Sequence, residues 1–179
     1  TRRSSDLSKV VAAYPNRAHP RFFRGVCRIN MGNYKEAEED FDVLLKKEPG
    51  NPNLLYFRAE ARRLRGNLTG ALSDYDKILS SGRNLIARDM TAETGKHRGN
   101  QSYFDDWIIS PIDIHYLKAA IYNDQKESKK AEESINKALK LNPKDTDTLL
   151  LAAGNAVQLN NLDKARAHLK EARILAASP

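Results

Sequence analysis

Apolar residues recur at helical spacing along most of the chain, in stretches that short polar turns separate. In the first complete stretch Phe22, Val26 and Ile29 follow an i, i+4, i+7 spacing, which places them on one face of a helix. The pattern predicts antiparallel helix pairs at 18–31 with 34–47, 52–65 with 69–80, 112–125 with 128–141, and 146–159 with 162–176. A lone helix is expected at 5–14. The sequence therefore predicts an all-α protein without a β-sheet.

The turns between these helices repeat with a fixed period. The segment from Gly32 to Ala37 returns 34 residues later as the segment from Gly66 to Ala71, and the same interval separates the segments 126–131 and 160–165. A period of this size is typical of a repeat array, in which each helix pair buries its apolar face against its neighbours. The period defines four units, at 18–51, 52–85, 112–145 and 146–179.

Equivalent positions of the four units carry the same kind of residue. Position eight is small in every unit, with Gly25, Ala59, Ala119 and Ala153. Position twenty is alanine in every unit, at Ala37, Ala71, Ala131 and Ala165. Position twenty-four is large and apolar, with Phe41, Tyr75, Ile135 and Leu169. Through these positions and the period, the chain resembles the tetratricopeptide repeat family.

The resemblance implies the fold class and the organisation of the chain. The expected fold is an all-α, right-handed superhelical array of antiparallel helix pairs, an α-solenoid. Residues 1–17 are expected to be the second helix of a truncated preceding repeat, and residues 86–111 a 26-residue insertion between the second and third repeats. We expect one continuous solenoid domain that is a fragment of a longer array, with uncapped ends through which copies of the chain can associate.

Composition and charge narrow the class of protein. The 179 residues are 40% hydrophobic and 30% charged, and no stretch is long and apolar enough to span a membrane. We therefore expect an intracellular, soluble protein without a membrane span, with the cytoplasm favoured. Cys27 is the sole cysteine, which excludes an internal disulfide. The formal net charge is +7, and residues 1–85 hold most of the excess, with 16 basic and 10 acidic residues.

No arrangement of residues indicates catalysis or metal binding. The four histidines are scattered, without carboxylates or cysteines at ligand spacing, at His19, His97, His115 and His168. The turn at 66–70 lacks the Gly-Lys-Ser/Thr ending of a phosphate-binding loop. We therefore expect a protein that is not an enzyme and that uses no cofactor and no metal.

Function in the tetratricopeptide repeat family resides on the concave surface, which the first helix of each unit lines. The resemblance assigns to a peptide-binding groove on this surface the residues Phe22, Val26, Ile29, Tyr56, Glu60, Arg63, Tyr116, Ala120, Asn123 and Leu150. The bulky members form an aromatic and apolar row that Glu60 and Arg63 interrupt. The alternative is that some of these residues belong to the core between helices.

The apolar row favours a protein-interaction scaffold, adaptor or co-chaperone-like module that binds an apolar or helical segment of another protein. Some members of the family grip the C-terminal carboxylate of chaperone peptides with a clamp of lysine, asparagine and arginine. The corresponding positions here hold Phe22, Val26, Phe57, Asp113 and Leu117. We therefore expect no carboxylate clamp.

Two arginine–aspartate pairs are expected to join the helices within a unit. Arg24 and Arg58 occupy position seven of the first two units, and Asp40 and Asp74 occupy position twenty-three of the same units. Both partners are absent from the other two units. A partly buried, bidentate bridge explains this joint presence and absence.

Four more arginines have no evident partner in the sequence and offer a basic patch: Arg28, Arg62, Arg63 and Arg65. They are the basis of an alternative function, nucleic-acid or acidic-ligand binding through the arginine-rich first half, with Tyr56 and Phe57 as stacking surfaces. Net charge alone is weak evidence for such a partner, so nucleic acid is the less favoured one.

The insertion combines a polar, glycine-containing stretch at 91–100 with an aromatic stretch at 103–109. Because burial of one large apolar side chain contributes roughly 1.5–3 kcal/mol, we expect Phe104, Trp107 and Ile108 to pack against the array. Two placements are open. The favoured one is a staple at the seam between the second and third units, and the other is a plug in the concave row.

Overall fold

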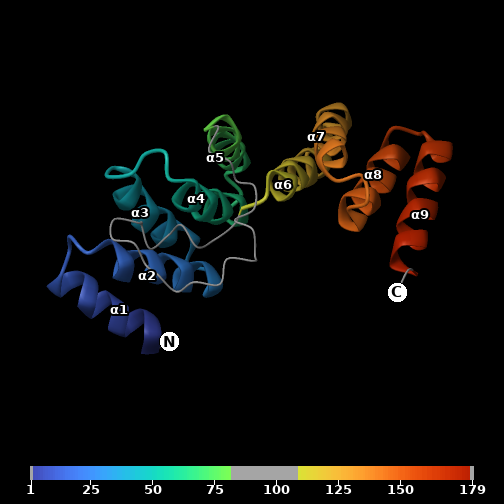
Figure 1. Cartoon of the computed structure of the whole chain (residues 1–179). Coiled ribbons are helices and arrows are strands. Elements are labelled where there is room, and N and C mark those ends of the chain that lie inside the picture. Colours follow the sequence, from blue (N-terminus) through green and yellow to red (C-terminus); the bar gives the residue numbers. More distant parts are fainter. Residues whose placement is uncertain (1, 82–108, 178–179) are drawn as a thin grey trace, which may run out of the picture. The chain divides into compact units, whose positions relative to one another are not determined.

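The computed structural model describes residues 2–81 and 109–177, and within these residues it contains nine helices and no strand (Figure 1). The helices are α1 (Arg2–Ala13), α2 (Ala18–Asn30), α3 (Tyr34–Leu45), α4 (Pro52–Leu64), α5 (Leu68–Ser80), α6 (Pro111–Asp124), α7 (Ser128–Leu141), α8 (Thr146–Gln158) and α9 (Leu162–Ala176). Every expected helix is present, with ends that agree within one turn. The prediction of an all-α array of helix pairs is confirmed.

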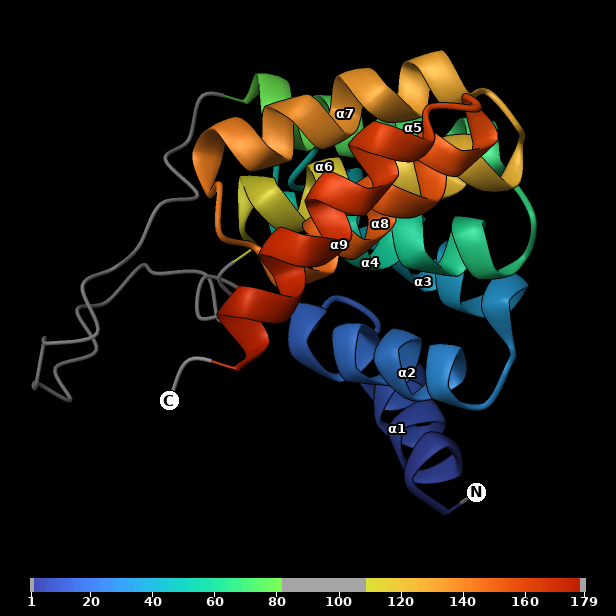
Figure 2. The same ribbon diagram turned by 90° about the vertical axis from the view of Figure 1, so that its right-hand side faces the viewer.

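The chain forms two compact units, Thr1–Ile109 with α1 to α5 and Ser110–Pro179 with α6 to α9. In the first unit α2 pairs with α3 and α4 with α5, while α1 packs on α2 (Figures 1 and 2). In the second unit α6 pairs with α7 and α8 with α9. Contacts between α3 and α4, and between α7 and α8, join successive pairs within each unit. That the two units continue one another as a single solenoid stays a prediction.

The turn inside each helix pair has the same backbone geometry. The equivalent residues Gly32, Gly66, Lys126 and Asn160 all have positive φ, at 79°, 88°, 59° and 55°. Glycine adopts this left-handed conformation without steric cost, and asparagine tolerates it. Each turn is only a few residues long, so the second helix of the pair begins directly after it. In two of these turns Asn67 and Asn161 accept a hydrogen bond from a backbone N–H of that helix, at 3.0 Å in both cases.

Small residues set the spacing of the paired helices. Gly25 is buried on α2 directly against Phe41 of α3, and a Cβ on Gly25 would lie 2.7 Å from Cζ of that ring. The close approach allows the rings of Phe22, Phe41 and Phe57 to form one cluster, with centroids 5.2–6.0 Å apart. The contact between Gly25 of α2 and Phe41 of α3 therefore lies at the centre of the core of the first unit.

The two expected arginine–aspartate bridges are present. Arg24 donates to both oxygens of Asp40, from Nε at 2.9 Å and from Nη2 at 2.5 Å. Arg58 binds Asp74 in the same way, at 2.9 and 2.6 Å. Both carboxylates are almost fully buried. Burial lowers the pKa of Arg58, but its hydrogen bonds to Asp74 and Asp42 outweigh that effect and raise the pKa overall.

We expect Gly25→Ala to destabilise the protein by about 1–3 kcal/mol, because the added methyl group overlaps the buried ring of Phe41. Gly154→Ala on α8 is the matched control, since a Cβ there meets nothing within 4 Å. This control should gain about 0.5–1 kcal/mol from helix propensity. Urea unfolding followed by circular dichroism measures both changes. Equal effects of the two substitutions would contradict the close approach.

We expect Asp74→Asn to cost on the order of 3 kcal/mol, because it leaves the guanidinium groups of Arg58 and Arg62 beside a neutral, buried amide. Glu39→Gln removes an exposed carboxylate from α3 and should change the free energy of unfolding by less than about 0.5 kcal/mol. The same unfolding measurement applies. A loss below about 1 kcal/mol for Asp74→Asn would mean that the bridge behaves as a surface ion pair.

Candidate functional site

The first helices of successive pairs lie next to one another within each unit. In the first unit α2 contacts α4, and in the second α6 contacts α8. The residues that the sequence assigned to a groove lie on these four helices. Five of them in the first unit are partly exposed, namely Val26, Ile29, Tyr56, Glu60 and Arg63.

Phe22 requires a correction, because the structure places it in the core. Its side chain is 1% exposed and packs edge-on against the rings of Phe57 and Phe41. Burying an aromatic ring against two others is more favourable than leaving it on an open surface. The alternative stated for this position, a residue of the core between helices, is the correct one.

Glu60 and Arg63, which interrupt the apolar row, form a hydrogen-bonded network with Tyr75. Glu60 accepts hydrogen bonds from Arg63, at 3.2 Å from Nε and 2.7 Å from Nη2, and from the hydroxyl of the buried Tyr75. Burial, followed by the negative charge of Glu60, raises the pKa of Tyr75, so this hydroxyl stays protonated and donates. The hydrogen bond to Glu60 likewise raises the pKa of Arg63. These hydrogen bonds hold the Glu60–Arg63 ion pair in one geometry on the face that α2 and α4 form.

In the second unit, Tyr116, Ala120 and Asn123 on α6 are partly exposed. Leu150 on α8 is 49% exposed, and Val157 on the same helix is 55% exposed. Leu150 and Val157 occupy positions five and twelve of their repeat, two of the positions assigned to the groove. In the second unit α8 therefore presents large apolar side chains to solvent.

The four arginines that lacked an evident partner in the sequence all bind carboxylates. Arg28 donates to Asp40 at 2.6 Å, and Arg63 to Glu60. Arg62 donates to Glu38 at 2.8 Å and to Asp74 at 2.7 Å, and Arg65 forms an ion pair with Glu38 at 2.8 Å. The acceptors of Arg28, Arg62 and Arg65 lie on neighbouring helices, which the linear sequence does not bring together, whereas Glu60 lies three residues before Arg63 on the same helix.

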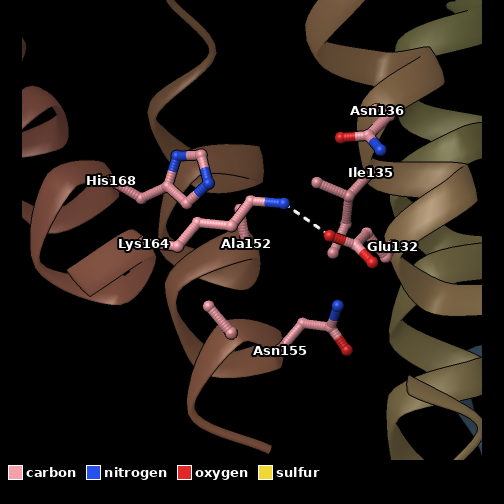
Figure 3. A pocket seen from close by; sticks show the side chains of 8 residues that line it. Glu132, Ile135, Asn136, Ala152, Asn155, Lys164 and His168 are labelled. Atoms are coloured by element: carbon pink, nitrogen blue, oxygen red, sulfur yellow. Dashed lines mark hydrogen bonds and ion pairs between the residues drawn. The ribbon is translucent and has the colours of Figure 1, made fainter. Parts of the chain in front are cut away.

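Sequence reasoning missed a small pocket enclosed by α7, α8 and α9 (Figure 3). Glu132 and Asn136 come from α7, Ala152, Asn155 and Ala156 from α8, and Lys164 and His168 from α9. Lys164 forms an ion pair with Glu132 across the pocket. Burial, and then the charge of Lys164, lowers the pKa of His168, which favours the neutral imidazole.

The pocket has few features of a metal site. Among the described residues, no group of three or more histidine, cysteine, aspartate and glutamate side chains is placed to hold a metal ion.

None of the described helices is long and apolar enough to cross a membrane. Phe104, Trp107 and Ile108, which the sequence predicted to pack against the array, lie outside the described residues.

Comparisons with known proteins agree with the helix-pair architecture. Two sequence profiles described as the tetratricopeptide repeat match the chain, one over residues 28–85 and the other over residues 112–145. No curated protein matches the chain.

Several solved structures are similar in fold. MamA from Desulfovibrio magneticus RS-1 is 17% identical with a TM-score of 0.74, and the match covers 97% of this chain and 83% of that one. A tetratricopeptide repeat protein from Parabacteroides merdae is 18% identical with a TM-score of 0.69, covering 94% of this chain and 57% of that one. YrrB, described as a TPR protein with an unusual peptide-binding site, is 13% identical with a TM-score of 0.54, covering 94% and 91%. At these identities the likeness shows the fold alone.

Proposed function

The chain belongs to the tetratricopeptide repeat family, and from that membership we propose that it is a protein-interaction scaffold which binds a segment of a partner on its first helices. The observation that carries the proposal is the row of apolar side chains left open on these helices. Leu150 and Val157 are about half exposed on α8, and Val26, Ile29 and Tyr56 are partly exposed on α2 and α4. Exposed apolar side chains gathered on the first helices within a unit are typical of a binding surface.

The chemistry of the face favours an apolar segment of the partner, either a helix or an extended strand of chain. Such a segment buries its own apolar side chains against the row. In the first unit the Glu60–Arg63 ion pair adds one fixed polar contact within the row. We propose that this pair sets the register of the segment by hydrogen bonding to a polar group at one position.

A C-terminal carboxylate is a poor ligand for these positions. Phe22 and Phe57 stand at two places of the family's clamp, and both are buried. Asp113 stands at a third, where its side chain is exposed to solvent. An acidic residue at this place repels a carboxylate instead of binding it. The absence of clamp residues supports a partner other than a chaperone tail.

The nucleic-acid alternative has lost its support. It depended on arginines without partners, and Arg28, Arg62, Arg63 and Arg65 each bind a carboxylate of the protein. A phosphate would have to displace these charge-assisted hydrogen bonds. This pairing favours the scaffold function over nucleic-acid binding.

A displayed library of helical and extended peptides, selected on the whole chain, provides the ligands for a test. Leu150→Ala should weaken binding of the selected apolar peptides about tenfold, because truncation of an interface anchor costs over 1 kcal/mol. Leu141→Ala is the matched control, since this leucine is 54% exposed on the second helix α7. Fluorescence anisotropy measures both affinities.

Tyr56→Ala extends the test to the first unit, where the ring is partly exposed on α4. Circular dichroism confirms that each variant is folded. Peptides that bind Leu150→Ala and Tyr56→Ala as tightly as they bind the original chain would refute the proposed surface. An enrichment of acidic peptides whose binding falls steeply with salt would also refute it.

A further inference from the structure

The second helix of a repeat packs against the first helix of the next repeat, as α3 does on α4 and α7 on α8. The last second helix, α9, contacts only α8 among the described helices (Figure 1). The side of α9 that corresponds to the α4-facing side of α3 is therefore not covered by a described helix. We call this side the α9 end face, and it carries Leu162, Arg166, Leu169, Lys170 and Arg173.

Position twenty-four shows what the α9 end face lacks. Phe41 on α3 is fully buried, and the ring of Phe57 from α4 stacks on it with centroids 5.9 Å apart. Ile135 on α7 is also buried, in a cluster against which Leu151 of α8 packs. Leu169 occupies the same position of α9, yet it is 50% exposed. In these two other repeats a large apolar side chain from the following first helix covers this position.

The charges beside this contact are acidic on the second helix of the first unit. Glu38 and Asp42 occupy positions twenty-one and twenty-five of α3. Glu38 pairs with Arg62 and Arg65 of α4, at 2.8 Å in both cases, and Asp42 accepts a hydrogen bond from Arg58 at 2.7 Å. The first helix that docks on α3 is therefore held by basic side chains beside its apolar contact.

On α9 the charges at these positions are reversed. Arg166 and Lys170 occupy positions twenty-one and twenty-five, and Arg173 lies one turn further along the helix. The side chain of Arg166 is 79% exposed, and its ion pair, at 3.8 Å, is with Asp163 of the same helix. Lys170 and Arg173 are exposed and pair with no carboxylate in the described part of the chain. The α9 end face thus combines exposed leucines with three basic side chains.

We propose that the α9 end face binds an acidic amphipathic helix of a partner protein, which docks on α9 as α4 docks on α3. A large apolar side chain of that helix covers Leu169, as Phe57 covers Phe41. Carboxylates that directly follow this apolar residue and recur four residues later face Lys170 and Arg166, because Arg58 and Arg62 have this spacing on α4. Charge-assisted hydrogen bonds between such groups gain strength as the helix excludes water.

A second copy of this chain is a poorer occupant, because its first helices have the wrong charge. Like charges across an interface are unfavourable, and basic residues at positions seven and eleven would face Arg166 and Lys170. None of the four first helices has an acidic residue at either position, where they hold Arg24, Arg58, Lys118 and Ala152, then Arg28, Arg62, Tyr122 and Ala156.

The inference rests on the proposed function at one residue, Leu150. Phe57 contacts Phe22 at position five as well as Phe41, so the docked helix also reaches Leu150, which occupies position five of the last repeat. The inference therefore names the partner of the proposed face at its α8 end. Its test uses substitutions on α9 alone, so its failure is distinct from a failure of the proposed function.

Two fluorescently labelled peptides are the probes. The unaltered probe is residues 51–65 of the chain, which include α4 and its N-cap Asn51. The acidic probe carries Arg58→Glu, Arg62→Glu and Arg65→Glu in the same peptide. Fluorescence anisotropy with the whole chain should show that the acidic probe binds about tenfold more tightly or better. Phe57→Ala in the acidic probe should weaken its binding about tenfold, since the apolar anchor is lost.

Leu169→Ala in the protein should weaken binding of the acidic probe about tenfold. Leu141→Ala is the matched control, because this leucine is 54% exposed on α7. Circular dichroism confirms that both variants are folded.

A charge exchange tests the polar contacts. Arg166→Glu together with Lys170→Glu should weaken the acidic probe about tenfold or more and make the unaltered probe the tighter ligand. Lys137→Glu together with Lys140→Glu changes the net charge equally through exposed residues of α7 and should leave the order of the two probes unchanged.

Four results would overturn the inference. Two are equal affinities of the two probes, and equal losses from the two double charge variants, since either would leave only attraction by net charge. The third is library peptides that lose affinity in Leu150→Ala and Tyr56→Ala but not in Leu169→Ala, which would leave the proposed function intact. The fourth is self-association in sedimentation velocity that Leu169→Glu abolishes, which would make a second copy the occupant.

Discussion

The close approach of the two helices in each pair is the constraint on which the rest of the structure depends. It exists because position eight and position twenty are glycine or alanine in every repeat, and Gly25, Ala37, Ala59 and Ala71 are buried in the first unit. Side chains of this size let the large residue at position twenty-four, such as Phe41, reach across to the facing helix. Each first helix packs on its second helix through one face. The opposite face of the first helix can therefore carry apolar side chains that are not part of the core.

Polar contacts add a second layer that differs between the two units. In the first unit buried aspartates bind arginines from the first helix of their own pair, and Arg58 and Arg62 also reach the preceding second helix. In the second unit alanines replace those arginines, and the small pocket remains. One backbone plan therefore supports a junction that two arginines fill in the first unit and a junction with the Lys164–Glu132 ion pair in the second. The apolar core changes with these replacements, because Ala152, at the position of Arg58, is buried in one cluster with Ala119 and Ile135.

The proposed binding face and the pocket involve different residues of α8. Leu150 and Val157 offer apolar surface to a segment that buries its own side chains. The pocket is lined by polar side chains that include Glu132, Asn155 and Lys164, and Lys164 forms an ion pair with Glu132.

The sequence by itself determined the helices, their pairing and the two bridges from Arg24 and Arg58. These features depend on local turns, a fixed period and residues that vary together, all of which are visible along one chain. Only the tertiary structure decided the role of Phe22, the partners of Arg62 and Arg65, and the existence of the pocket. The sequence of one helix does not show whether an aromatic side chain packs against the neighbouring helix or faces a ligand. For this reason Phe22 was wrongly assigned to the groove. Arg62 and the pocket each depend on three helices at once, and the distance between such side chains is set by packing, which the linear order of residues does not record.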